Sequence, residues 1–159
     1  MNAHPSPLKC HGYYVTELAL TANPHHKPEK EVNLHFSDLS IESTTEQVAQ
    51  EQNGPIWRVA LRVHQNVGPD KNSPYNFAVS LLGTFEVHPK FPEDKAKQLV
   101  EVNGSSILYG AARQILRQAM SSGPFIPLLL PSASFTEPPA VGNANAVAES
   151  KTEYGNKTP

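Results

Sequence analysis

The stretch VNGSSILYGAARQILRQAMSSGPFIPLLLPSASF, residues 102–135, decides the fold of this chain. Its first half repeats apolar residues at the spacing of an amphipathic helix, and Ser105 or Ser106 can cap the start of that helix. Gly123 and Pro124 end it, because glycine adopts the left-handed conformation of a helix end and proline cannot continue the helix. The stretch therefore predicts one helix of about four turns, followed by an apolar loop interrupted by prolines.

Two apolar lines run along the predicted helix. They consist of Leu108, Ala111, Ala112, Ile115 and Ala119, and of Tyr109, Leu116 and Met120. Most side chains of the first line are small, so another backbone can approach it closely. Two interpretations follow: a core helix packed on the chain's own sheet, or a helix shared between that sheet and a partner subunit.

Four segments ahead of the helix alternate apolar and polar residues as β-strands do. They are residues 8–20, 31–41, 56–67 and 75–87. The first places Tyr14 and Leu18 on one side and Tyr13 and Val15 on the other, and the second slips in phase after Phe36, which predicts a bulge or bend. The polar stretch 43–55 and residues 91–102 are expected to connect elements, the latter with one helical turn. The segments predict an antiparallel sheet arranged as a meander or a close relative of one.

Composition restricts the class of protein. The 159 residues fit one domain, and the net charge of −2, with scattered basic residues, lacks the basic patch of a nucleic-acid binder. Cys10 is the single cysteine, which excludes an internal disulfide and a multi-thiolate metal site. No long apolar run and no secretory leader pattern occurs, so we expect a cytoplasmic protein without membrane insertion. Residues 1–7 are expected to be flexible, and the Pro-, Gly- and Asn-rich residues 136–159 to form a disordered tail.

Several strings of the chain resemble the bacterial protein-export chaperone family SecB. Glu31-Val32-Asn33-Leu34, Val59-Ala60-Leu61-Arg62-Val63 and Gly83-Thr84-Phe85 are similar to parts of three strands of that family. Ile107-Leu108-Tyr109-Gly110-Ala111-Ala112-Arg113 resembles its helix, and Ser122-Gly123-Pro124-Phe125-Ile126-Pro127-Leu128-Leu129-Leu130-Pro131 resembles its apolar loop. The likeness covers residues 8–135, which we expect to form one SecB-like domain.

The resemblance implies an α+β fold, with a four-stranded antiparallel sheet and one long amphipathic helix. It implies dimers that meet through their first strands and helices, assembled into a tetramer or remaining homodimers. The implied function is that of an ATP-independent holdase, which binds unfolded polypeptides in apolar grooves and passes them to the export motor SecA. Neither a cofactor nor catalysis is implied.

The residues expected to carry this function form three sets. Client-binding candidates are Phe36, Trp57, Tyr75, Phe77, Phe125, Ile126, Leu128 and Leu130. Oligomer-interface candidates are Tyr14, Leu108, Ala111, Ala112, Ile115, Leu116 and Ala119. The motor-docking candidate is Glu17, the acidic residue that remains where the family places several; Thr21 and Ala78 stand at other such positions.

The chain also departs from the family after Phe135. Pro138 and Pro139 exclude a helix there, so the family's second helix is expected to be missing or replaced. This departure favours a variant of the SecB type, such as a specialised chaperone of an antitoxin or of an accessory operon.

Two further classes of protein are alternatives to a chaperone. One is a non-chaperone oligomeric peptide-binding module of the same fold. The other is an enzyme, for which the sequence offers no phosphate-binding loop, dinucleotide fingerprint or nucleophile elbow. His25, His26 and His35 with Glu29 or Asp38 lack the spacing of a preformed metal site, so no metal is expected.

Overall fold

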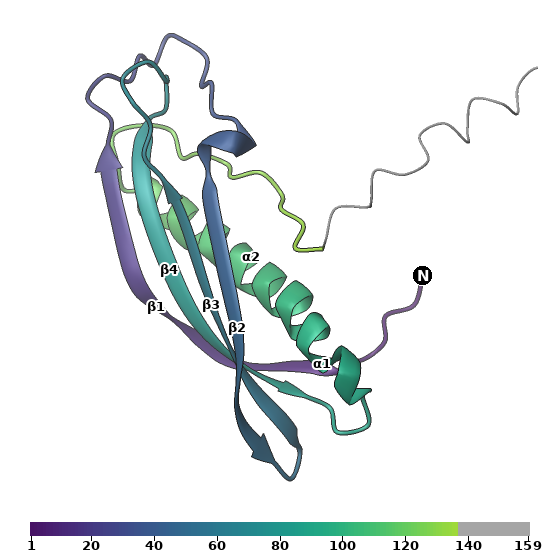
Figure 1. Cartoon of the computed structure of the whole chain (residues 1–159). Coiled ribbons are helices and arrows are strands. Elements are labelled where there is room, and N and C mark those ends of the chain that lie inside the picture. The colour runs from purple at the N-terminus through teal and green to yellow at the C-terminus, as the bar shows by residue number, and fades with distance from the viewer. Residues whose placement is uncertain (137–159) are drawn as a thin grey trace, which may run out of the picture.

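The computed structural model of the chain describes residues 1–136. One sheet contains four antiparallel strands, in the order β1-β4-β3-β2. They are β1 (Leu8–Ala22), β2 (Ser40–Glu51), β3 (Gly54–Gln65) and β4 (Tyr75–Val87). β2, β3 and β4 follow one another directly, whereas residues 23–39 cross from one edge of the sheet to the other (Figure 1). This Greek-key order is a close relative of the predicted meander, and the predicted four-stranded antiparallel sheet is confirmed.

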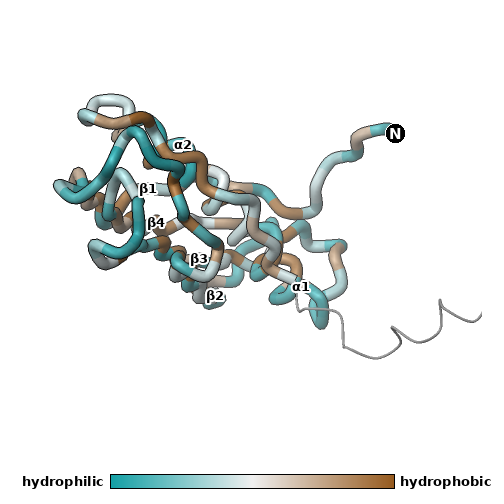
Figure 2. The backbone as a smooth tube through the Cα atoms, turned by 90° about the horizontal axis from the view of Figure 1, so that it is seen from above, coloured by the Kyte–Doolittle hydropathy of each residue, from teal (hydrophilic) through white to brown (hydrophobic). Residues whose placement is uncertain are grey.

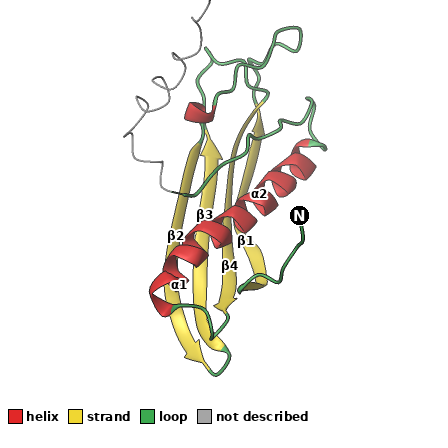
Figure 3. Ribbon diagram, turned by 90° about the vertical axis from the view of Figure 1, so that its right-hand side faces the viewer, coloured by secondary structure: helices red, strands yellow, loops and turns green. Residues whose placement is uncertain are grey.

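A single helical run lies across one face of the sheet (Figure 3). It consists of α1 (Glu93–Leu99), the π-helical segment η2 (Val100–Gly104) and α2 (Ser105–Met120) without a break. The long helix was predicted correctly, but its predicted start is wrong. The Oγ of Ser105 lies 2.6 Å from Ser43 Oγ, and Ser106 Oγ donates to the carbonyl of Val102 at 2.6 Å, so neither serine acts as a cap.

The predicted second strand at residues 31–41 is also wrong. Residues 31–35 belong to no strand, the short 3-10 turn η1 (Phe36–Asp38) follows, and β2 begins at Ser40. β2 therefore occupies most of the polar stretch 43–55, which the sequence predicts to be a connection. It is an edge strand that pairs with β3, and most of its side chains are exposed. Backbone hydrogen bonds hold such a strand without apolar alternation, so its sequence carries little strand signal.

A bulge changes which side chains of β1 lie together. The pairing with β4 shifts between Val15 and Glu17, which leaves Thr16 without an opposite residue. Tyr13, Val15 and Leu18 consequently stand opposite Gly83, Leu81 and Val79, on the face of the sheet that the helix covers. Tyr14 lies opposite Leu82 on the other face. The predicted grouping of Tyr14 with Leu18 is therefore wrong, because it assumed an unbroken period of two.

The core lies between α2 and the two central strands. Alternate residues of β3 and β4 face the helix and are completely buried, and α2 covers them with side chains that are equally buried. These residues are Val59, Val63, Val79 and Phe85 from the strands and Leu108, Ala112, Leu116 and Met120 from the helix. The same period-two pattern that predicted the strands thus defines the buried face.

Gly54 and Gly110 provide a matched test of this architecture. Gly54 opens β3 with a φ of +125°, and a Cβ there would collide with the carbonyl oxygen of Val87, whereas a Cβ on Gly110 of α2 would meet open space. Gly54→Ala should lower the free energy of unfolding by about 2 kcal/mol or more. Gly110→Ala should raise it by about 0.5–1 kcal/mol. Urea denaturation of both variants measures these changes, and equal stability of the Gly54 variant and the parent would contradict the hairpin geometry.

Candidate peptide-binding groove

An apolar groove of about 650 Å³ opens at the end of the molecule where α2 ends. One wall comes from residues 23–39, here called the crossover, through Val32, Leu34 and Phe36. The other wall comes from the loop after α2 and includes Phe125, Ile126 and Leu129. Figure 2 shows hydrophobic stretches in the loop that leads from α2 to the grey trace. The volume falls within the range of about 300–1,000 Å³ that is typical of ligand pockets.

The loop wall is held by two tyrosine hydroxyls. Tyr75 Oη accepts a hydrogen bond from the N–H of Phe125 at 2.9 Å and donates to the carbonyl of the same residue at 2.7 Å. Tyr109 Oη donates to the carbonyl of Pro131 at 2.7 Å. Burial raises the pKa of Tyr109, so its hydroxyl keeps the donated proton at neutral pH. These bonds replace the backbone partners that a proline-rich loop lacks.

The loop wall alternates anchors and exposed side chains. Leu128 and Leu130 are buried against the core, whereas Ile126 is 86% exposed and Leu129 is 74% exposed. The loop therefore exposes the side chains of Ile126 and Leu129 at the groove, while the buried Leu128 and Leu130 hold the loop against the core.

Asn72, in the connection between β3 and β4, holds the crossover wall. Its Nδ2 donates to the carbonyls of Lys27, Lys30 and Glu31 at 3.1, 3.1 and 2.9 Å, and its Oδ1 accepts from the N–H of Lys27 at 2.8 Å. Its own N–H donates to Asn33 Oδ1. One amide side chain thus fixes the segment that leads into Val32, Leu34 and Phe36.

The structure divides the predicted client-binding residues into two groups. Phe36, Phe125, Ile126 and Leu128 line the groove. Trp57, Tyr75, Phe77 and Leu130 do not line this groove and are buried in the core, with Trp57 beside a separate cavity of about 370 Å³. Sequence reasoning missed Val32, Leu34 and Leu129. The alternation of Val32, Leu34 and Phe36 is the available signal, but such a pattern predicts a strand and not a groove wall.

The predicted oligomer-interface residues are divided in the same way. Leu108, Ala112 and Leu116 are buried against the chain's own sheet, as the interpretation of a core helix expects. Ala111, Ile115 and Ala119 remain partly exposed, and Tyr14 is exposed on the opposite face of the sheet. The helix-covered face instead leaves three large side chains of β1 half-exposed. These are Tyr13, Val15 and Leu18, which the sequence-based set did not include.

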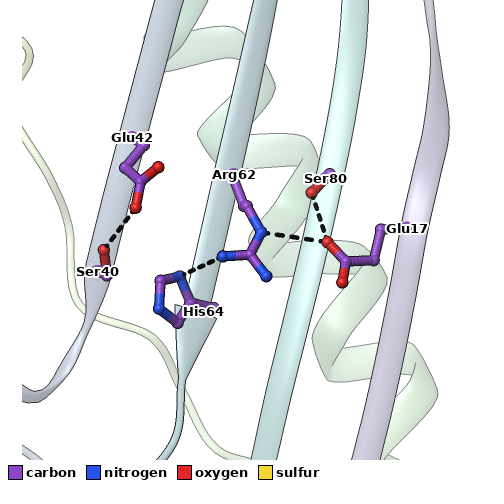
Figure 4. A network of polar contacts seen from close by, with 6 residues as sticks. All are labelled: Glu17, Ser40, Glu42, Arg62, His64 and Ser80. Atoms are coloured by element: carbon purple, nitrogen blue, oxygen red, sulfur yellow. Dashed lines mark hydrogen bonds and ion pairs between the residues drawn. The ribbon is translucent and has the colours of Figure 1, made fainter.

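Glu17, the predicted docking residue, lies in a polar network on the outer face of the sheet (Figure 4). Its Oε2 accepts from Arg62 Nε at 3.2 Å and from Ser80 Oγ at 2.9 Å, and Arg62 also contacts His64 Nδ1 at 3.1 Å. The hydrogen bond from Arg62, followed by that from Ser80, holds the pKa of Glu17 below its usual value. The carboxylate is therefore ionised but already paired.

Residues 1–136 contain no group of three or more His, Cys, Asp or Glu side chains placed to hold a metal ion. No helix within the same range is long and apolar enough to cross a membrane.

Fold and groove together define a small α+β protein whose open apolar groove can accommodate a peptide segment. Residues 3–137 match the family model described as preprotein translocase subunit SecB, so the chain belongs to the SecB family. A protein-export protein SecB of Wolbachia pipientis (subsp. Culex pipiens, strain wPip) is 23% identical over 142 residues, which cover 80% of this chain and 84% of that protein. The predicted membership is thereby confirmed.

A solved structure shows the same fold. It is a SecB-like chaperone of Mycobacterium tuberculosis in complex with a ChAD peptide from the HigA1 antitoxin. The TM-score is 0.56 at 13% sequence identity, and the match covers 80% of this chain and 88% of the other.

Asn72→Ala tests how the crossover wall is held. Loss of the amide clamp should accelerate amide hydrogen exchange across residues 24–36 and lower the free energy of unfolding by about 1 kcal/mol. Asn76→Ala is the matched control, since Asn76 Oδ1 accepts from the N–H of Val67 and the Asn76 side chain makes no hydrogen bond to residues 23–39. Exchange in residues 24–36 that is equally slow in both variants would show that Asn72 does not position this wall.

Proposed function

We propose that this chain is an ATP-independent holdase, which binds unfolded polypeptide segments in the groove and keeps them competent for protein export in the cytoplasm. The observation that carries the proposal is the exposure of Phe36, Ile126 and Leu129 beside one groove. Exposed apolar side chains that take no part in the core favour contact with apolar groups of another molecule. Such contact contributes about 25 cal/mol of free energy for each Å² of apolar surface removed from water.

The geometry suits clients of varied sequence. Both walls present side chains rather than a fixed set of polar groups, so binding depends on apolar area more than on one ligand shape. Membership of the SecB family supports the same function. Such binding needs no cofactor and no covalent step, and we therefore propose no enzymatic activity.

The chain is also proposed to act as an oligomer. One edge of β1 pairs with β4, while Tyr13, Val15 and Leu18 stay half-exposed on the face of the sheet that carries α2. Ala111 and Ile115 of α2 are partly exposed as well. A second copy that packed on this surface would cover it and could extend the sheet through β1. The assembly is proposed to be a homodimer or a dimer of dimers.

SecA is a candidate partner, but Glu17 gives such docking little support because its carboxylate is bonded to Arg62 and Ser80. A second candidate function is therefore a chaperone dedicated to one client, such as an antitoxin. The bound antitoxin peptide of the Mycobacterium protein motivates this alternative. A non-chaperone peptide-binding module would differ from both, because it would not protect generic unfolded proteins.

Aggregation of a reduced, unfolded client tests the holdase function. Wild-type protein should suppress light scattering by the client, and the double variant Ile126→Ser/Leu129→Ser should bind client about tenfold more weakly or worse. Both side chains are exposed, so the variant should remain folded. Val48→Ser, at an exposed position of β2 outside the groove, is the control. Equal suppression by the double variant and the control would contradict the proposed site, and no suppression by wild type would favour a dedicated binding module.

Light scattering of the purified protein tests the proposed subunit contact. Val15→Glu places a charge on the helix-covered face of β1 and should reduce the mass of the assembly, because a buried unpaired carboxylate disfavours association. Tyr14→Glu places the same charge on the opposite face and should leave the mass unchanged. A monomeric wild type, or dissociation by the Tyr14 variant alone, would argue against this interface.

A further inference from the structure

The ionisable side chains that line the groove are both bases. They are His26 and Lys30, and no aspartate or glutamate side chain lines it within the described residues. Lys30 gives the groove lining a positive charge, whereas the net charge of the whole chain is −2. The remaining lining side chains are apolar, so these two groups determine the polarity of the site.

The acidic side chains of the crossover do not neutralise this pair inside the groove. Asp38 is already engaged, since its carboxylate lies 3.3 Å from Lys71 Nζ and accepts from the N–H of His35 at 2.9 Å. Glu29 and Glu31 belong to the same segment, but neither lines the groove. Lys30 makes no ion pair within residues 1–136.

His26 adds a second polar atom without a partner. Its ring packs edge-on against Phe125, with 4.8 Å between the centroids, and its buried Nδ1 has no hydrogen-bond partner among the described residues. A buried polar atom of this kind lowers its free energy by gaining a partner. The base of the loop wall thus combines an aromatic contact with an unused polar group.

We propose that the groove selects apolar segments that carry a carboxylate, which pairs with Lys30 while the apolar side chains contact the two walls. The inference rests on the proposed function, because it names the class of segment that the same groove prefers. A lysine or arginine of a client would meet Lys30 as a like charge and would find no carboxylate partner among the lining side chains. The carboxylate can come from an aspartate or glutamate side chain or from the end of a chain.

Fluorescent peptides with one shared apolar core test the proposal on the full-length protein. Two peptides with amidated ends carry either aspartate or lysine beside the core, and two peptides without charged side chains end in either a free carboxylate or an amide. Fluorescence anisotropy should show about 2- to 5-fold tighter binding of the aspartate peptide than of the lysine peptide, as an exposed ion pair allows. The ratio should shrink as salt is added. The second pair shows whether a chain end serves as well as a side chain.

Charge reversal at Lys30 assigns the preference to this residue. Lys30→Glu should invert the order of the aspartate and lysine peptides, whereas Lys27→Glu, in the same segment but outside the groove lining, should retain it. Equal affinity for the two peptides, or an order that Lys30→Glu leaves unchanged, would overturn the inference while apolar binding and the proposed function stand. If none of the peptides bound, the proposed function and this inference would fail together.

Discussion

A single α-helix is too narrow to cover a four-stranded sheet, and most features of this protein follow from that constraint. A helix with its side chains is about 10–12 Å wide, whereas neighbouring strands lie about 4.8 Å apart. The helix therefore buries the central strands completely, as Val59 and Val79 show, but leaves β1 half-covered at Val15 and Leu18. Apolar surface at the side and end of the sheet stays available for other contacts.

The chain covers part of the remaining surface with loops, and each loop is held by very few polar side chains. Tyr75 is buried at the start of β4, and its hydroxyl binds both the N–H and the carbonyl of Phe125. Asn72, shortly before it in the chain, holds the crossover. Two residues of one connection and the strand that follows thus position both walls of the groove. The walls can present apolar side chains to solvent because their backbones, rather than those side chains, are fixed.

Charge is distributed differently on the two parts of the surface that concern binding. On the outer face of the sheet, Glu17 forms an ion pair with Arg62, and Glu46 forms one with Arg58. The acidic side chains of these two pairs therefore already have basic partners within the chain. Within residues 1–136, Lys30 in the groove has no such partner. An apolar groove with an unpaired base and an outer face with paired acids would favour different partners, which separates client binding from any docking on the sheet.

The sequence alone determined the elements whose signal is local. The period-two pattern of β3 and β4, the helical pattern of α2 and the proline-rich apolar loop were all correct, because each reflects one buried face repeated along a continuous segment. Tertiary structure decided what local patterns cannot contain. The bulge at Thr16 changes which side chains of β1 share a face, and hydrogen bonding to β3 makes a strand of a polar stretch. Contacts between segments far apart in the sequence bury Trp57 in the core and place Val32 at the groove. The physical reason is that burial and pairing at these positions depend on residues far away in the chain, which periodicity within one segment does not record.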